Sequence, residues 1–183
     1  IDREAMREKI RQLAWKVRSG IVLGGSQETA EALHHAFFVV EGLVPDEEFG
    51  AKAEPETAVL STVLETKRGV CLSLSLLYLA AADEAGLPLY GVAVPTHFFV
   101  RYQLGGDRLN LETLDRGGVT RTDDFYAERF LIRKGEAFYL ESLTPKMTLA
   151  VYLSQLGAIY TRQGKTEQAI ELLQVAEKAS PRD

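Results

Sequence analysis

The sequence has very little cysteine: Cys71 is the only one among 183 residues. A single cysteine cannot form a disulfide within the chain, so the fold must be held together by packing. This composition favours a cytosolic protein. A periplasmic location is also compatible with the sequence if a signal peptide was removed before Ile1.

Other absences exclude whole classes of function. The net charge is −5 and no run of lysine and arginine is interleaved with aromatic residues, so we expect no nucleic-acid partner. No apolar stretch approaches the roughly 18–20 residues that a membrane-spanning helix needs. The cysteine and the three histidines are scattered without the spacing of metal ligands, and no glycine-rich phosphate loop is present. We therefore expect neither a metal nor a cofactor.

What is present predicts an α+β fold. Hydrophobic residues make up 46% of the chain and charged residues 26%, which is typical of a globular domain. Apolar residues recur at helical spacing in the first part of the chain, with a third helix expected at 56–66. The segment 71–85 is apolar nearly all round and predicts a helix buried in the centre of the domain. Strand-like segments at 88–103 and 109–114 flank the turn signal Gly105-Gly106.

The C-terminal segment has a different pattern. Thr144-Pro145 is typical of a helix start, because a capping residue precedes a proline at the first helical position. The residues after it match the helix-turn-helix signature of a tetratricopeptide repeat: Leu153, Leu156, Gly157, Tyr160, Gly164, Ala169, Leu173, Ala176 and Pro181. We predict a core at 1–143 and a repeat helix pair at 144–183. One repeat cannot bury its own face, so the pair docks on the core or the natural chain continues beyond Asp183 with further repeats.

Three residues form a candidate catalytic group. Cys71 stands at the start of the apolar helix, where open N–H groups and the positive end of the helix dipole stabilise a thiolate. His97 lies in the first strand of the predicted hairpin. With a two-residue loop in that hairpin, Glu112 becomes a diagonal cross-strand neighbour of His97. We predict that Cys71 is the nucleophile, His97 the base and Glu112 the acid that orients the imidazole.

Each assignment has an alternative. Most free cysteines are small buried hydrophobic residues, and Cys71 fits that description as well. A one-residue bulge in the hairpin would leave Glu112 as a surface carboxylate, and Asn110 is then the second candidate for orienting His97. Thr57 and Ser61 are candidates for completing an oxyanion hole, together with the backbone N–H of Cys71.

Several short motifs resemble the bacterial transglutaminase-like family. They are Gly69-Val70-Cys71, Gly86-Leu87-Pro88, Tyr90-Gly91-Val92 and His97-Phe98-Phe99-Val100-Arg101, and the similarity is strongest over 63–118. The resemblance implies a papain-like core, with the nucleophile on a central helix packed against an antiparallel sheet. It also implies the roles of Cys71 and His97 given above, and a C-terminal tetratricopeptide-like segment. Glu112 stands where transglutaminases usually have an aspartate before threonine.

Two functions fit the sequence. The one we favour is a thiol-dependent acyl-transfer enzyme that acts on amide bonds of a protein or peptide, as a cysteine peptidase, an amidase or a transglutaminase. The alternative is a catalytically silent module that holds a partner protein through its repeat. Many relatives with this architecture have another residue, often proline, in place of the cysteine, and this chain keeps it.

Overall fold

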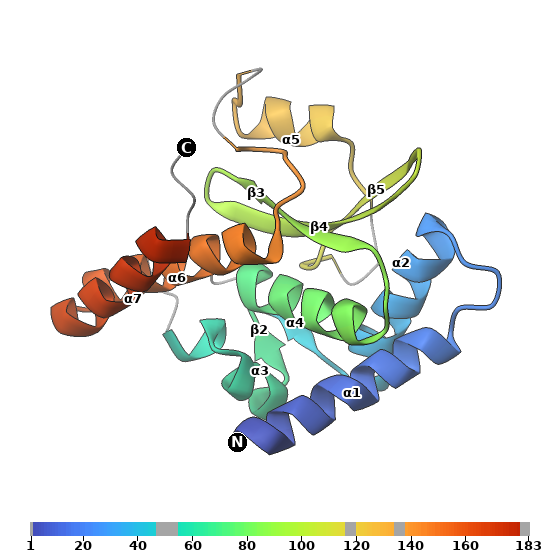
Figure 1. Ribbon diagram of the computed structural model, residues 1–183, viewed down its shortest axis with the longest axis horizontal. Coiled ribbons are helices and arrows are strands. Elements are labelled where there is room, and N and C mark those ends of the chain that lie inside the picture. The colour runs from blue at the N-terminus through green and yellow to red at the C-terminus, as the bar shows by residue number, and fades with distance from the viewer. Residues whose placement is uncertain (1, 47–54, 116–119, 134–137, 180–183) are drawn as a thin grey trace.

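The fold is a three-stranded antiparallel sheet with helices on both faces (Figure 1). The computed structural model describes residues 2–46, 55–115, 120–133 and 138–179. The strands follow one another along the chain and across the sheet: β3 (Leu89–Val94), β4 (His97–Leu104) and β5 (Asp107–Leu111). The predicted mixture of helix and sheet is confirmed.

Two helical segments precede the core. Helix α1 (Arg3–Ser19) begins after Asp2, whose side chain accepts a hydrogen bond from the Ala5 N–H at 2.8 Å and so caps the helix. Helix α2 (Ser26–His34) continues directly into a π-helical segment, η1 (His35–Val40). The sequence predicts an amphipathic helix over this stretch, but its period gives no sign of the wider π-helical turn.

The segment between η1 and the central helix differs from the prediction. The helix expected at 56–66 is interrupted at Val59, which has extended backbone angles and separates the 3₁₀ turn η2 (Pro55–Ala58) from α3 (Leu60–Thr66). Two short strands flank this segment: β1 (Val44–Pro45) pairs in parallel with β2 (Arg68–Gly69). Such short, non-local pairing leaves no periodic signal in the sequence.

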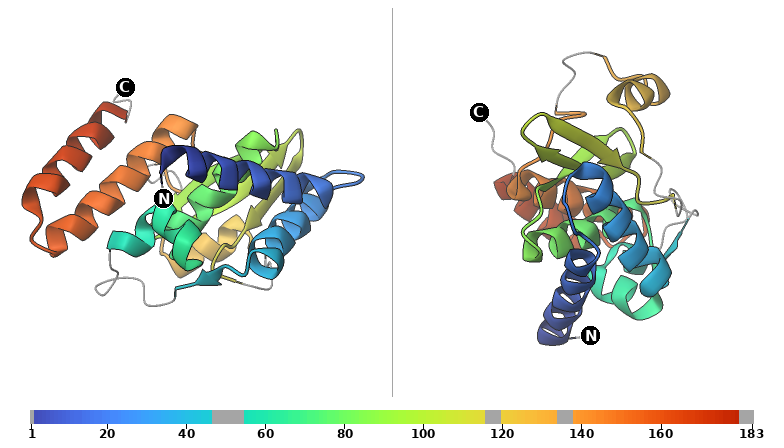
Figure 2. Two further views of the ribbon diagram at one scale, coloured as in Figure 1. Left: turned by 90° about the horizontal axis from the view of Figure 1, so that it is seen from below. Right: turned by 90° about the vertical axis from the view of Figure 1, so that its right-hand side faces the viewer.

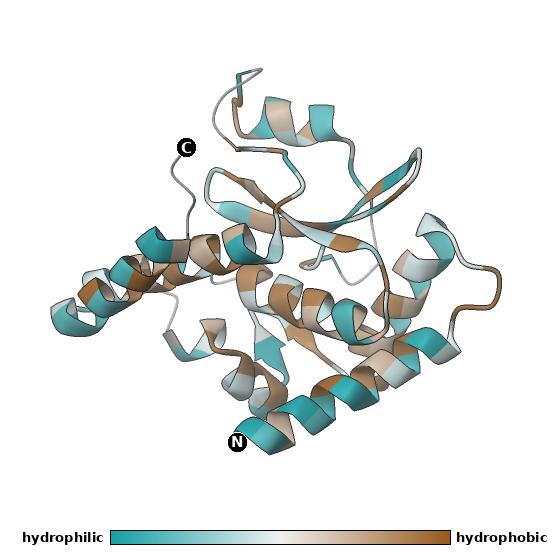
Figure 3. Ribbon diagram, viewed as in Figure 1, coloured by the Kyte–Doolittle hydropathy of each residue, from teal (hydrophilic) through white to brown (hydrophobic). Residues whose placement is uncertain are grey.

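Helix α4 (Cys71–Glu84) forms the centre of the molecule, as its apolar composition predicts. One of its sides packs against the sheet, where Leu74, Leu77 and Tyr78 share a core with Val100 and Tyr102. Helix α1 crosses its other side (Figure 2). Figure 3 shows hydrophobic residues concentrated on α4 and hydrophilic residues along the outward side of α1. Burying a helix on several sides in this way requires the nearly continuous run of apolar residues seen in α4.

The opposite face of the sheet is covered by α5 (Asp123–Arg129) (Figure 1). Tyr126 of this helix packs with Phe99 of the sheet, their ring centroids 4.0 Å apart. An ion pair fixes the same helix at its start, because the buried Arg101 guanidinium donates to Asp123 at 2.6 Å and to the Asn110 side-chain oxygen at 2.6 Å. The face of the sheet opposite to α4 is thus closed by one short helix.

The C-terminal segment is a pair of helices, α6 (Pro145–Arg162) and α7 (Thr166–Ala179), at one side of the molecule (Figure 2). Thr144 caps α6 by accepting from the Met147 N–H at 3.3 Å. Helix α6 also contributes Leu156 and Ile159 to a core cluster with α4 and the sheet. At Gly157, an added Cβ would lie 2.9 Å from a Leu173 side-chain carbon, so only glycine permits this spacing between the helices.

Three further observations complete the fold. Gly164 adopts the predicted turn between α6 and α7, with φ of 72°. Pro181, the last position of the repeat signature, lies outside the described residues. In the part of the chain that the structure describes, no helix is long and apolar enough to cross a membrane.

Candidate active site

Cys71 is the first residue of α4, and its backbone is held on two sides. Ser73 Oγ accepts from the Val70 N–H at 3.0 Å and donates to the Thr57 carbonyl at 2.8 Å, which ties the start of α4 to η2. Thr113 Oγ1 donates to the Cys71 carbonyl at 3.3 Å, which ties it to the end of β5. These contacts fix the position of the sulfur relative to the sheet. The Cys71 side chain itself is buried, with 1% of the residue exposed.

His97 is the first residue of β4 and follows a two-residue turn in which Thr96 has φ of 62°. The turn Gly105-Gly106 at the other end of β4 also has two residues, because Leu104 pairs directly with Asp107. This register places Glu112 diagonally across from His97, as predicted. The His97 Nε2 and Glu112 Oε2 atoms are 2.8 Å apart.

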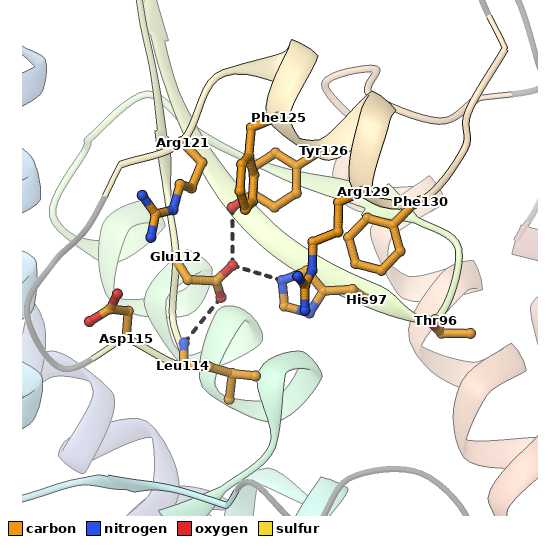
Figure 4. A pocket seen from close by; sticks show the side chains of 10 residues that line it. All are labelled: Thr96, His97, Glu112, Leu114, Asp115, Arg121, Phe125, Tyr126, Arg129 and Phe130. Atoms are coloured by element: carbon orange, nitrogen blue, oxygen red, sulfur yellow. Dashed lines mark hydrogen bonds and ion pairs between the residues drawn. The ribbon is translucent and has the colours of Figure 1, made fainter.

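Glu112 is held by two further donors (Figure 4). The Tyr126 hydroxyl donates to the same oxygen, Oε2, at 3.0 Å, and the Leu114 N–H donates to Oε1 at 3.2 Å. Burial raises the pKa of Glu112, but the hydrogen bond and the positive charge of His97, with the other two donors, outweigh it and lower the pKa from its usual value. Glu112 is therefore a carboxylate at neutral pH.

The Cys71 side chain lies beside the His97 imidazole and favours its protonated form. Since Nε2 faces Glu112, Nδ1 is the ring nitrogen left for the sulfur. Burial alone would lower the pKa of His97, but its interactions with Cys71 and with the Glu112 carboxylate raise this pKa to about 9. The structure thus brings Cys71, His97 and Glu112 together in one connected group, with the histidine in the middle.

An open cavity of about 670 Å³ lies beside this group (Figure 4). Its walls come from the turn before β4, the end of β5 and helix α5, and it is lined by Thr96, His97, Glu112, Leu114, Asp115, Arg121, Phe125, Tyr126, Arg129 and Phe130. The Phe130 ring stacks on the His97 ring, with centroids 5.9 Å apart and planes inclined by 10°. Among the described residues, no three His, Cys, Asp or Glu side chains gather in a metal-binding arrangement.

The remaining predicted site residues lie elsewhere or have other partners. Asn110 is on the same face of the sheet as His97, but its side chain bonds to Arg101, Asp123 and the Arg121 carbonyl, so it does not orient the imidazole in this structure. Thr57 reaches the start of α4 through its carbonyl, which accepts from Ser73. Neither Thr57 nor Ser61, a residue of α3, lines the cavity beside His97. Their role in an oxyanion hole stays a prediction.

Two residues of the site were not predicted from the sequence. Tyr126 holds Glu112 from α5, an element that pairs with neither strand of the hairpin. Thr113 joins the strand to the Cys71 carbonyl and also lies 3.0 Å from Ser75 Oγ of the same helix. A signal for Thr113 exists, because it follows Glu112 directly in the segment that resembles the family. Nothing in the local sequence around Tyr126 indicates its partner.

Parts of this chain are similar to curated proteins. UPF0162 protein PM0557 of Pasteurella multocida (strain Pm70) is 39% identical over 66 residues, which are 33% of this chain and 25% of that protein. F-box only protein 21 of Mus musculus is 40% identical over 53 residues, 29% of this chain and 8% of that protein, and the same values hold for Homo sapiens. The chain therefore spans a quarter or less of these curated relatives. No solved structure gives a significant match.

A family model covers most of the chain. The model described as the transglutaminase-like superfamily matches residues 4–151, from α1 into α6, and so includes the central helix, the sheet and the connected Cys–His–Glu group. The chain belongs to the transglutaminase-like superfamily.

Proposed function

We propose that the protein is a thiol-dependent acyl-transfer enzyme that acts on amide bonds of a protein or peptide. The observation that carries this proposal is the position of the His97 side chain, which bonds to the Glu112 carboxylate at 2.8 Å and whose imidazole also interacts with the Cys71 side chain. A nucleophile, a base and a third group that orients the base are the parts that nucleophilic catalysis requires. Membership of the transglutaminase-like superfamily supports the same chemistry.

The proposed reaction has two stages. In the reacting state the proton of the Cys–His pair lies on His97, as its raised pKa favours, and the Cys71 thiolate attacks the amide carbonyl carbon to form a tetrahedral oxyanion. Open N–H groups of the first turn of α4 are the nearest candidates to stabilise that oxyanion. The C–N bond then breaks as His97 returns the proton to the leaving amine. Water or a second amine next attacks the thioester, and the acceptor decides between hydrolysis and transfer.

Glu112 and Tyr126 act through His97 in this mechanism. The Glu112 carboxylate holds the imidazole by Nε2, so that Nδ1 stays directed at the sulfur, and it stabilises the imidazolium formed in the first step. Tyr126 holds the carboxylate by its hydroxyl. We regard both as positioning residues. Glutamate here, in place of the usual aspartate, reaches His97 with one more methylene group.

A second function has one observation in its favour. Cys71 is 1% exposed and does not line the cavity, which is what a silent cysteine in a protein-interaction module would show. In that case the protein would act through a tetratricopeptide-type pair of α6 and α7. Ile170 and Val175 of α7 are each 50% exposed and would face a further repeat or a partner protein.

Alkylation of Cys71 distinguishes the two functions. The rate of iodoacetamide labelling is measured across pH in the wild-type protein, with the same protein in urea as the reference for an unprotected thiol. A free thiol ionises with a pKa of roughly 8.5. At pH values below this, we expect the folded enzyme to label faster than the unfolded chain. His97→Ala should remove this advantage, and Glu112→Gln should reduce it.

A matched control is Asp83→Asn, which alters an exposed residue at the other end of the same helix, away from His97. The variant is expected to keep the labelling rate of the wild type. If the folded protein labels more slowly than the unfolded chain at every pH, the thiol is silent and the enzyme proposal is wrong. The interaction module then becomes the working hypothesis.

A further inference from the structure

The cavity beside His97 carries a charge opposite to that of the chain as a whole. The protein has a net charge of −5, yet one wall of the cavity presents two arginines from the same short helix segment. Arg121 precedes α5 and Arg129 is its last residue. Both guanidinium groups are exposed, and neither forms an ion pair with another residue drawn in Figure 4.

Each arginine lies over an aromatic ring of α5 that also lines the cavity. The Arg121 guanidinium carbon is 5.0 Å from the centroid of the Phe125 ring, and that of Arg129 is 5.9 Å from the Phe130 ring. Such contacts restrict where the guanidinium groups can go while leaving their N–H donors open to solvent. The two side chains are therefore held at the cavity wall with unused donors.

The negative groups of the same cavity leave these donors available. Glu112 already accepts from His97, Tyr126 and the Leu114 N–H. Asp115 is the second carboxylate that lines the cavity. With His97 protonated, three positive groups face two carboxylates, so the cavity attracts anions.

We propose that this cavity binds an acidic segment of the substrate, with one carboxylate at Arg121 and a second at Arg129. This inference rests on the proposed acyl-transfer function, because it names the substrate class for that site. The arginine fork matches a carboxylate in shape and donates two parallel hydrogen bonds to it. The Phe125 and Phe130 rings give the aliphatic part of a glutamate side chain an apolar surface to lie against.

The spacing of the arginines sets the spacing of the carboxylates. Arg129 lies about 9 Å along the helix axis from Asp123, and Arg121 lies two residues before Asp123, outside the helix, so the two Cα atoms are at most about 16 Å apart. An extended peptide covers a distance of about 9–16 Å in roughly three to five residues. The structure therefore favours a peptide in which two acidic residues flank the reactive amide, each two positions away from it.

Binding without chemistry tests the inference. The probe is the peptide acetyl-Glu-Ser-Gln-Ser-Glu-amide, titrated into the full chain carrying Cys71→Ser, with acetyl-Lys-Ser-Gln-Ser-Lys-amide as the matched basic peptide. Calorimetry gives the affinity, and two-dimensional NMR gives the residues that shift. We expect the acidic peptide to bind at least tenfold more tightly than the basic one, to shift resonances of α5, and to weaken as salt rises.

Two double variants, each of which loses two arginine charges, compare the cavity with a distant surface. Arg121→Gln/Arg129→Gln should weaken the acidic peptide at least tenfold. Arg3→Gln/Arg18→Gln removes the same two charges from α1, far from the cavity, and should leave the affinity within about twofold. Thermal unfolding of both variants shows whether either has lost its fold. Equal binding of the two peptides, or an equal effect of the two double variants, would overturn the inference.

A second readout separates this inference from the proposed function. In the protein with Cys71 intact, the labelling rate of the anionic reagent iodoacetate is divided by that of the neutral reagent iodoacetamide. This ratio measures how strongly the cavity attracts an anion, and it should fall at least threefold in Arg121→Gln/Arg129→Gln. If the thiol is reactive but the ratio of the two labelling rates is the same in the wild type and in Arg121→Gln/Arg129→Gln, the acidic-substrate inference is wrong and the proposed enzyme function is unaffected. If the acidic peptide binds tightly but the thiol is unreactive, the cavity binds acidic segments and the proposed enzyme function is wrong.

Discussion

The hydrogen bond from Tyr126 to Glu112 offers the sharpest test of how the site is held together. Tyr126→Phe removes one oxygen atom and keeps the ring, which stays stacked on Phe99 at 4.0 Å. The lost bond is made to a partly buried carboxylate, and bonds to charged groups contribute about 1.5–3 kcal/mol each. We expect the free energy of unfolding to fall by about that amount.

The matched control is Tyr152→Phe, in which the half-buried hydroxyl loses a bond to the neutral Ala58 carbonyl at 3.2 Å. A bond between neutral groups contributes about 0.5–1.5 kcal/mol, so this variant should be the less destabilised of the two. Urea unfolding at neutral pH measures both. A double-mutant cycle of Tyr126→Phe with Glu112→Gln isolates the interaction and should give a coupling energy of about 1–2 kcal/mol. A coupling energy near zero would refute this description of the site.

Three further predictions concern charge and packing. Protonated His97 contributes its full stability below pH 6.5 and loses it as the pH rises through about 9, because folding raises its pKa. His97→Gln should therefore destabilise the protein most near pH 6 and least near pH 9.5 in urea unfolding; an effect that grows with pH would contradict this. Asp123→Asn leaves the buried Arg101 guanidinium without its carboxylate and should cost about 3–5 kcal/mol, read from the urea midpoint. Gly157→Val should cost about 1–3 kcal/mol in thermal unfolding, since an added Cβ would lie 2.9 Å from a side-chain carbon of α7; an unchanged midpoint would show that α7 shifts freely.

Local signals explain why the central part of the site could be predicted. The start of α4 at Cys71 follows from an apolar run that begins directly after Gly69-Val70. The pairing of His97 with Glu112 follows from a two-residue turn, because Gly105 adopts φ of 58° and sets the register of the whole hairpin. Both inferences depend on residues close together in the sequence.

Long-range partners explain what could not be predicted. Asn110 shares a face with His97, but the buried Arg101 directly opposite it and Asp123 of α5 take its side chain. The break in the third helix at Val59 similarly has no signal in the apolar period. Hydrogen bonds between elements far apart in sequence decide these details, and periodicity carries no information about them.

The local charge of the cavity is another feature that could not be predicted from the sequence. The net charge of −5 suggests a protein that repels acidic substrates. Folding places Arg121 and Arg129 on one wall of the cavity beside His97. The total charge is a sum over the chain, whereas recognition depends on which side chains the fold gathers at one place.

Acyl transfer to Cys71 can be measured directly with 4-nitrophenyl acetate, an activated acyl donor. The account predicts a burst of 4-nitrophenolate equal in amount to the protein, with one acetyl group found on Cys71 by mass spectrometry. The burst should be absent in Cys71→Ala and slowed at least a hundredfold in His97→Ala, in line with the usual contribution of a general base. Release of nitrophenolate at the same rate from the wild type and from Cys71→Ala would contradict the central claim, because the connected group of Cys71, His97 and Glu112 would then perform no acyl transfer.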